Sequence, residues 1–372
     1  MISKALVTAS YRSKVAMLNA RAAGAIEVAV LCPPRWGALP FEPMPDDAAY
    51  PLFVRPIWGN GHHHLHRYPA LSAVVKAYRP DLLHIDEEHY SWVTFEAAAV
   101  ARRRRIPALF FTWQNLYKRY PWPFSAFEQA VFRACAEAIA GNRDAEQVLR
   151  QKGYRGRITV IPQFGVDPAF TPDRRGEARE RYGTAGRFAV GYVGRLVPEK
   201  GVGDLLAAAA PLLRSGQTRL LLVGRGPCGA ELAREAERLG VAEAVSLLPW
   251  VASAEMPAVM RALDVLVLPS RTTARWKEQF GRVLTEAMAS GTVVVGSDSG
   301  EIPHVIGDAG FVFPEGDVAA LRAILERLAR DPGLADAART RGMERVATHF
   351  TQAAVADATL AVYRRMLGIE SQ

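Results

Sequence analysis

Short runs of apolar, often β-branched residues alternate along most of this chain with stretches that have helical spacing. The runs expected as strands are residues 5–8, 27–31, 82–85, 108–111, 158–161, 188–193, 219–223, 244–248, 265–268 and 292–295. The stretches expected as helices include 71–77, 91–104, 124–138, 203–213, 229–239 and 282–289. This alternation is typical of a parallel sheet covered by helices on both faces. The sequence therefore predicts an α/β fold.

The pattern occurs twice, and a Pro- and Arg-rich stretch at 167–175 separates the two series. A length of 372 residues also fits two domains better than one. We expect an N-terminal domain over 1–166 and a C-terminal domain over 167–351. Consecutive amphipathic helices are expected from 317 to 367, with breaks near 331–333 and 349–351. Two sheet domains followed by terminal helices predict a cleft between the domains.

Composition and cysteine usage indicate the cellular compartment of the protein. Hydrophobic residues make up 49% and charged residues 23%, which is ordinary for a globular protein. The three cysteines, Cys32, Cys135 and Cys228, fit neither a disulfide framework nor a zinc site. No signal peptide and no run long enough to span a membrane is recognisable. We therefore expect a cytoplasmic protein without a transmembrane segment.

The positive charge is confined to the first part of the chain. Residues 1–165 carry 21 Lys and Arg against 13 Asp and Glu, whereas residues 166–372 carry 25 of each kind. A basic domain attracts an anionic lipid surface, a phosphorylated substrate or nucleic acid through its summed field. Nucleic acid is the poorer fit, because no recognised binding module accompanies the charge. We therefore keep two interpretations of this charge, an anionic acceptor and a peripheral position on the inner face of the membrane.

The segment Glu-Gln-Phe-Gly-Arg-Val-Leu-Thr-Glu at 278–286 carries the strongest local signal. It follows an expected strand and opens an expected helix, which is where open α/β sheets place ligands. Free backbone N–H groups near Phe280, Gly281 and Arg282, with the helix dipole behind them, favour a diphosphate. Glu278 on the loop and Glu286 two turns into the helix suit two separated sets of hydroxyl groups. A solvated helix residue is the alternative interpretation of Glu286.

A second cluster of charged residues follows the strand expected at 188–193. Gly194 and Arg195 come first, and Lys200 follows on the same short loop. Both cations can converge on an anion, because Arg supplies a forked donor and Lys a point charge. Three more candidates, Gly224, Gly226 and Trp250, lie on loops after the next two strands, where a nucleoside would fit.

These pieces, in this order and spacing, resemble glycosyltransferase family 4, whose members have the GT-B fold of two Rossmann-like domains with parallel sheets facing across a cleft. The resemblance covers residues 158–348 well and the N-terminal half in general architecture only. It implies a C-terminal helix, here 352–372, that returns to the N-terminal domain. It also implies that the N-terminal domain binds the acceptor and the C-terminal domain binds a nucleotide diphosphate sugar.

The family implies a retaining sugar transfer that needs no catalytic metal and no cofactor beyond the nucleotide sugar. By resemblance, Arg195 and Lys200 hold the donor diphosphate, Glu278 orients hydroxyl groups of the donor sugar, and Glu286 binds the ribose. Backbone N–H groups of Phe280 and Gly281 add contacts to phosphate and sugar. In the front-face mechanism commonly proposed for such enzymes, the leaving phosphate helps to take the acceptor proton.

The N-terminal half departs from the family pattern at two loops. Many relatives have a glycine pair after the first strand, where this chain reads Thr-Ala-Ser-Tyr-Arg at 8–12. Others have a histidine after the fourth strand, where this chain reads Thr-Trp-Gln-Asn at 112–115. We expect candidates for acceptor contacts on these loops and after the strand at 82–85. They are Tyr11, Arg12, His84, Asp86, Glu87, Gln114 and Asn115.

Several other interpretations stay open at this point. His62, His63, His64 and His66 invite a metal site, but adjacent imidazoles on a loop do not easily share one tetrahedral ion, and we expect none. A nucleotide-sugar epimerase would turn over without an acceptor, and a phosphorylase would need a pyridoxal phosphate lysine. A non-catalytic sensor would bind the nucleotide sugar without transferring or hydrolysing it. The acceptor itself stays undefined among polysaccharide, lipid-linked saccharide and small molecules.

Overall fold

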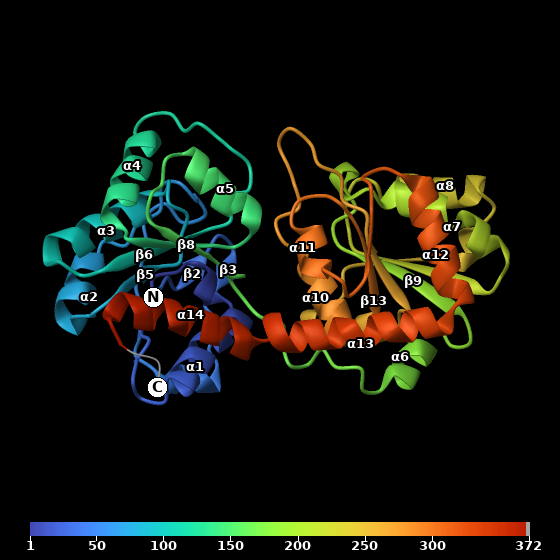
Figure 1. Ribbon diagram of the computed structural model, residues 1–372, viewed down its shortest axis with the longest axis horizontal. Coiled ribbons are helices and arrows are strands. Elements are labelled where there is room, and N and C mark those ends of the chain that lie inside the picture. Colours follow the sequence, from blue (N-terminus) through green and yellow to red (C-terminus); the bar gives the residue numbers. More distant parts are fainter. Residues whose placement is uncertain (370–372) are drawn as a thin grey trace. The chain divides into compact units, whose positions relative to one another are not determined.

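The computed structural model describes residues 1–369, which form two compact units (Figure 1). The first unit comprises residues 1–165 together with helix α14 (Gln352–Leu367), and the second comprises Val166–Thr351. Val166 belongs to the second unit because its amide donates to the Phe350 carbonyl at 2.7 Å. Residues 370–372 of the expected helix at 352–372 lie outside the described residues.

The second unit is built on one six-stranded parallel sheet with the strand order β11-β10-β9-β12-β13-β14. The strands are β9 (Phe188–Val193), β10 (Thr218–Val223), β11 (Val245–Leu248), β12 (Val265–Leu268), β13 (Val293–Ser297) and β14 (Phe311–Phe313). The chain moves outward from β9 through β10 to β11 and then returns to place β12 on the other side of β9. The sheet order therefore reverses between β9 and β12, which makes this the topological switch point where such sheets bind ligands.

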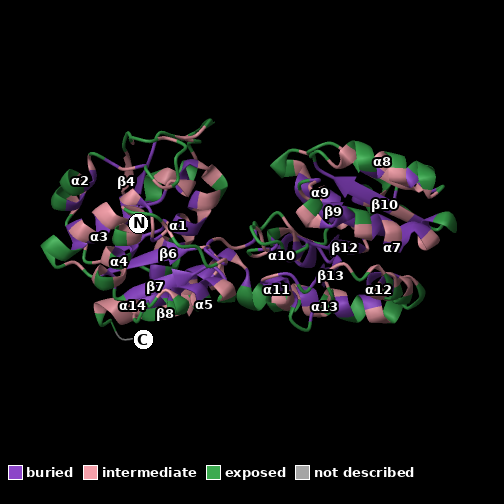
Figure 2. Ribbon diagram, turned by 90° about the horizontal axis from the view of Figure 1, so that it is seen from above, coloured by how far each residue is buried: buried purple, intermediate pink, exposed green. Residues whose placement is uncertain are grey.

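Helices cover both faces of this sheet. They are α6 (Arg175–Arg181), α7 (Val202–Arg214), α8 (Gly229–Arg238), α9 (Met256–Arg261), α10 (Arg282–Ala289), α11 (Ile302–Ile306), α12 (Val318–Arg330) and α13 (Pro332–His349). Helix α7 packs against α8 and α12, whereas α10 packs against α9 and α13. Figure 2 shows the strands buried and the outer sides of the helices exposed. Continuous apolar strands such as Val265–Leu268 are what a sheet covered on both faces requires.

The predicted elements of this unit are confirmed closely. The strands at 188–193 and 265–268 and the helix at 282–289 have the expected bounds. The helix breaks near 331 and 350 are also present. The short elements β14, α6, α9 and α11 were not expected, because three to seven residues give too little periodicity to recognise.

The first unit also contains parallel strands, in two groups that are bridged by a residue near the amino terminus. The strands are β1 (Val30–Cys32), β4 (Leu52–Val54), β5 (Leu83–Ile85), β6 (Ala108–Thr112), β7 (Glu137–Ala140) and β8 (Arg157–Val160). Pairing follows the orders β1-β4 and β5-β6-β7-β8, and Ile2 bridges Leu31 on one side and Ile85 on the other. A separate hairpin joins β2 (Arg35–Trp36) to β3 (Leu39–Pro40).

Two predictions in this unit are wrong. The run at 5–8 is not a strand, because Ala5–Val7 forms the 3-10 helix η1 and the central pairing is made by Ile2 instead. The helix expected at 124–138 ends at Ala134, since Glu137–Ala140 is strand β7 between β6 and β8. The alanines of residues 134–140 are compatible with a helix or a strand. Hydrogen bonding of 137–140 to both β6 and β8 stabilises the strand.

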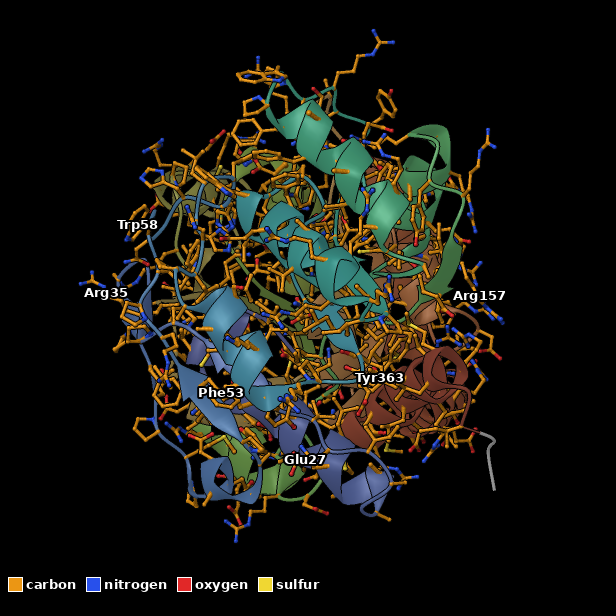
Figure 3. The ribbon with its side chains drawn as sticks, turned by 90° about the vertical axis from the view of Figure 1, so that its left-hand side faces the viewer. Glu27, Arg35, Phe53, Trp58, Arg157 and Tyr363 are labelled. Carbon is orange, nitrogen blue, oxygen red and sulfur yellow. The ribbon has the colours of Figure 1, made fainter. Side chains whose placement is uncertain are left out.

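The helices of this unit are α1 (Ala9–Ala22), α2 (Leu71–Tyr78), α3 (Trp92–Arg104), α4 (Phe124–Ala134), α5 (Arg143–Gln151) and α14. Helix α14 packs along α1, and Val355, Leu360 and Tyr363 share a hydrophobic core with Leu18 and Val30. Figure 3 labels Tyr363 of α14 and Phe53 of β4. The last helix of the chain is therefore part of the first unit, as the family resemblance implies.

Candidate functional site

The loops after β9 and β12 meet at the switch point of the second sheet. Lys200 ends the 3-10 turn η3 (Pro198–Lys200), and its Nζ lies 2.5 Å from Glu278 Oε2. Ser270, two residues beyond β12, donates to the same carboxylate oxygen at 3.0 Å. Both charged side chains are largely covered, with 14% and 10% of their surfaces exposed. The structure thus brings together one cation and one carboxylate from loops 78 positions apart.

Close backbone packing fixes the position of Lys200. Gly201 has φ of +63°, and a Cβ there would lie 2.0 Å from the Pro269 carbonyl oxygen. Only glycine therefore lets the β9 loop pass so close to the end of β12. The neighbouring loop is held in the same way, because a Cβ on Gly226 would lie 2.2 Å from the Leu196 carbonyl oxygen.

Helix α10 begins shortly after Glu278, and its N-cap residue is a glycine. Its N-cap is Gly281, with φ of +77° and no side-chain hydrogen bond to the first turn. The first N–H groups of a helix have no partner inside the helix and carry part of its positive dipole. Phe280 precedes the cap and packs against the core of the second unit, which fixes the entry into the helix. The amino end is therefore suited to an anion.

Glu286 lies on the second turn of α10 and is 8% exposed. Arg282, one turn earlier, places Nε 3.1 Å from its Oε1. Burial raises the pKa of Glu286 to about 7, and the attraction of Arg282 only partly offsets this. A buried carboxyl group that titrates near neutrality is a feature of functional sites more often than of surface helices. This geometry favours the ligand interpretation of Glu286 over the solvated one.

Two other candidates of the second unit, Arg195 and Trp250, lie at its surface. Arg195 has 63% of its side chain exposed, and its Nη2 lies 3.8 Å from Glu199 Oε1. Trp250 follows β11 and is 54% exposed. Gly194 and Gly224 directly follow the neighbouring strands β9 and β10 and pack against each other. Arg195 and Trp250 are thus open to a ligand, but the structure does not pair them with Lys200 or Glu278.

Sequence reasoning missed two residues of this site. Ser270 hydrogen-bonds to Glu278, and the Trp276 ring centre lies 4.7 Å from Lys200 Nζ. The only available signal was position, since both residues lie on the loop that ends in Glu278.

Arg12 is a structural residue and not an acceptor contact, which corrects the expectation. Its guanidinium is fully buried and forms a two-bond ion pair with Asp47, with Nε–Oδ1 and Nη2–Oδ2 distances of 2.7 and 2.9 Å. It also donates to the carbonyls of Leu6, Val7 and Glu42. These bonds join α1 to the loop that follows β3. No face of the guanidinium is left for a ligand.

The candidates that follow β5 are buried as well. Burial would raise the pKa of Glu87, but the nearby charges of Lys4 and His66 lower it to about 2. His84 is 3% exposed and shares a hydrogen bond of 2.6 Å with the Tyr363 hydroxyl, and burial lowers the pKa of His84 well below its usual value. These contacts make Glu87 and His84 parts of the interior, contrary to the acceptor role expected for them.

The remaining candidates of the first unit are also enclosed. Asp86 is 2% exposed and accepts from Gln163 Nε2 at 3.0 Å. Tyr11 stacks on Phe164 with ring centres 4.1 Å apart. Gln114 and Asn115 are 7% and 9% exposed. The structure gathers these residues near the carboxyl edge of the strands, where Tyr11 is partly exposed and the other three are buried.

Neither a metal centre of several ligands nor a membrane span occurs in the described part of the chain. Among residues 1–369, no group of three or more His, Cys, Asp or Glu side chains is arranged to hold a metal ion. None of the helices described is long and apolar enough to cross a membrane.

Comparison with known proteins gives matches in both units. The family model described as "Glycosyltransferase Family 4" matches residues 15–170, and "Glycosyl transferases group 1" matches residues 187–331. A D-inositol 3-phosphate glycosyltransferase of Mycolicibacterium smegmatis is 36% identical over 64% of this chain and 55% of its own length. A GDP-mannose-dependent phosphatidylinositol monomannoside mannosyltransferase of the same species is 39% identical over 48% of this chain and 49% of its own length.

The matched parts span about half of the length of these two curated relatives. A solved structure of Anabaena Alr3699/HepE in complex with UDP and glucose covers 98% of each chain with a TM-score of 0.70 and 20% identity. At that level of identity the likeness shows a shared fold, which is the GT-B fold of two Rossmann-like domains.

Proposed function

The chain belongs to glycosyltransferase family 4, and from this premise we propose that it transfers a sugar from a nucleotide diphosphate donor to an acceptor, with retention of configuration and without a catalytic metal. The observation that carries the proposal is the ion pair of Lys200 and Glu278 beside the amino end of α10. A cation from one loop and a carboxylate from another meet there, which suits the binding of a charged sugar donor.

Each group has a separate task in this proposal. Lys200 and Arg195 neutralise the diphosphate as its charge grows, together with the backbone N–H groups at Phe280 and Gly281. Glu278 accepts hydrogen bonds from the sugar hydroxyls, and Glu286 accepts them from the ribose. Gly194, Gly224, Gly226 and Trp250 line the nucleoside side, and the Arg282 side chain neutralises Glu286 until the donor binds.

In the proposed transfer, no side chain of the enzyme has to take the proton of the acceptor. The bond between the anomeric carbon and the phosphate oxygen breaks, and the acceptor oxygen forms its bond to that carbon on the same face. The acceptor proton passes to the departing phosphate oxygen. Cations and a helix amino end supply the charge stabilisation that this step needs.

A panel of nucleotide sugars tests this function directly. Donors that bind are expected to raise the temperature of unfolding, because a ligand specific for the native state stabilises it. The panel includes GDP-mannose and UDP-glucose, which appear in the names of similar proteins. The best donor is then incubated without acceptor, and slow release of nucleoside diphosphate is expected. Binding without any hydrolysis or transfer would point to a sensor instead.

Affinity for the donor is expected to rise about tenfold between pH 6 and pH 8. The Glu286 carboxyl, with its pKa raised to about 7 by burial, must be ionised to accept two ribose hydroxyls. Below that pKa, binding must first remove a proton, so affinity falls as pH falls. Titration calorimetry with an intact nucleotide sugar is suitable, because the phosphates of a diphosphate diester do not titrate in this range. Glu286→Gln should bind more weakly and lose the pH dependence, and an unchanged slope in this variant would refute the assignment.

We further propose that the first unit binds an acceptor at an anionic membrane surface. All of the excess charge, +8, lies in residues 1–165. Trp58 and Trp122 are 65% and 82% exposed in this unit, and Figure 3 shows Trp58 and Arg35 at the same edge. Exposed tryptophan together with cations is typical of surfaces that rest on lipid headgroups.

The protein is therefore expected to sediment with vesicles of phosphatidylglycerol and phosphatidylcholine and to be released when salt is raised from about 0.1 M to about 0.5 M. Trp122→Ala should weaken this binding. Trp250→Ala removes an exposed tryptophan from the second unit and serves as the matched control. Equal binding to pure phosphatidylcholine would exclude the electrostatic part of the proposal.

A further inference from the structure

The indole ring of Trp276 forms one wall around the ammonium group of Lys200. The ring centre lies 4.7 Å from Lys200 Nζ, while Glu278 Oε2 lies 2.5 Å from the same atom. Only 14% of the Lys200 side chain is exposed. The cation is therefore held between an aromatic face and a carboxylate. Trp276 lies two residues before the 278–286 segment and was not among the candidate residues named from the sequence.

The position of Trp276 is set by its own loop and not by Lys200. Its amide donates to Thr273 Oγ1 at 3.0 Å, and its carbonyl accepts from the Thr273 amide at 2.8 Å, which closes a tight turn. Thr272, which precedes Thr273, donates its hydroxyl hydrogen bond to Glu315 at 2.5 Å. The same hydroxyl lies at a hydrogen-bond distance of 2.9 Å from the Ser299 hydroxyl. The turn is thus anchored to the loops after β13 and β14.

An aromatic face is a suitable holder for a cation that must change partners. The ring attracts an ammonium group through its quadrupole and keeps water away from one side of it. It offers no strong hydrogen-bond acceptor that would compete with a phosphate oxygen. When a donor enters, the ammonium group exchanges Glu278 for the diphosphate, and Glu278 is released toward the sugar hydroxyls. The aromatic contact can persist through this exchange.

We propose that Trp276 is a positioning residue that presents Lys200 to the diphosphate of the donor. This inference rests on the proposed function, because it assumes that Lys200 binds that group. Trp276 acts through Lys200 and needs no contact with the reacting atoms.

A double-mutant cycle on the full chain tests the inference. The variants are Trp276→Leu, Lys200→Met and the double substitution, each measured for donor affinity by calorimetry and for donor hydrolysis. In the wild-type background, Trp276→Leu is expected to lower kcat/KM about tenfold, a difference of about 1.4 kcal/mol. In the Lys200→Met background the same change should cost less than about twofold, because the group it positions is gone. Trp276→Phe retains an aromatic face and should recover most of the loss.

The matched control is Trp92→Leu, which removes a ring lying 5.4 Å from the Arg67 guanidinium in the first unit. It should leave donor affinity and hydrolysis unchanged. Equal losses from Trp276→Leu in both backgrounds would show that the tryptophan only supports the loop, and would overturn the inference. A wild-type chain that neither binds nor hydrolyses any nucleotide sugar would refute the proposed function instead, so the two failures are distinguishable.

Discussion

Lys200→Met is expected to lower the turnover of donor about 100- to 1000-fold, the range seen when one preorganised charge-stabilising donor is removed. Lys200 is largely covered and lies 2.5 Å from Glu278, so solvent cannot replace its charge. Arg195→Ala should have a clearly smaller effect, because 63% of that side chain is exposed. Steady-state kinetics on both variants with one donor measure the difference. A larger loss for Arg195→Ala would reverse the order of importance assigned to the two cations.

Removal of Lys200 also leaves Glu278 without its cation, which by itself destabilises a covered carboxylate. The double variant Lys200→Met with Glu278→Gln removes both charges and keeps a hydrogen-bonding group for Ser270, which lies 3.0 Å from the carboxylate. It should unfold at a temperature closer to that of the wild type than Lys200→Met alone does. Its turnover should stay low. Recovery of both stability and turnover would mean that the lysine only neutralises a buried charge.

Local patterns were sufficient to predict much of the second unit. The strand Val265–Leu268 is a continuous apolar run, and the helix Arg282–Ala289 begins directly after Gly281, so the bounds of both elements could be predicted from local sequence. The order of the strands then explains why Lys200 and Glu278 meet, since both follow strands that are neighbours in the sheet. Loops at the carboxyl ends of neighbouring parallel strands converge whatever their separation in sequence.

Side-chain partners from distant segments could not be predicted in the same way. Arg12 was expected at an acceptor because it lies on the segment that departs from the family pattern after the expected first strand, but Asp47 and three carbonyl oxygens enclose it. Trp276 was overlooked because an aromatic residue on a polar loop gives no sign of the cation it will meet. Such contacts depend on how long loops fold back on a sheet, and sequence spacing does not record this.

Gly224→Ala is expected to destabilise the second unit by about 3 kcal/mol, which corresponds to a fall in Tm of roughly 6–12 °C. A Cβ at this position would lie 1.8 Å from the carbonyl oxygen of Gly194, and Gly224 has φ of +147°. The obstacle is backbone, so no side chain can turn aside to relieve the overlap. The two glycines directly follow the neighbouring strands β9 and β10, so the loop that begins at Gly194 and carries Lys200 must shift. Donor affinity should therefore fall together with stability.

Gly203→Ala provides the matched control for this substitution. Gly203 lies in helix α7, no heavy atom lies within 4 Å of the place that a Cβ would take, and its φ is not in the left-handed region. Alanine there should raise stability by about 0.5–1 kcal/mol, because it limits the unfolded chain and favours the helix. Thermal unfolding followed by circular dichroism, with and without donor, compares the two variants. If Gly224→Ala unfolded at the wild-type temperature and still bound donor, the close approach of the β9 and β10 loops would not be what holds Lys200 in place.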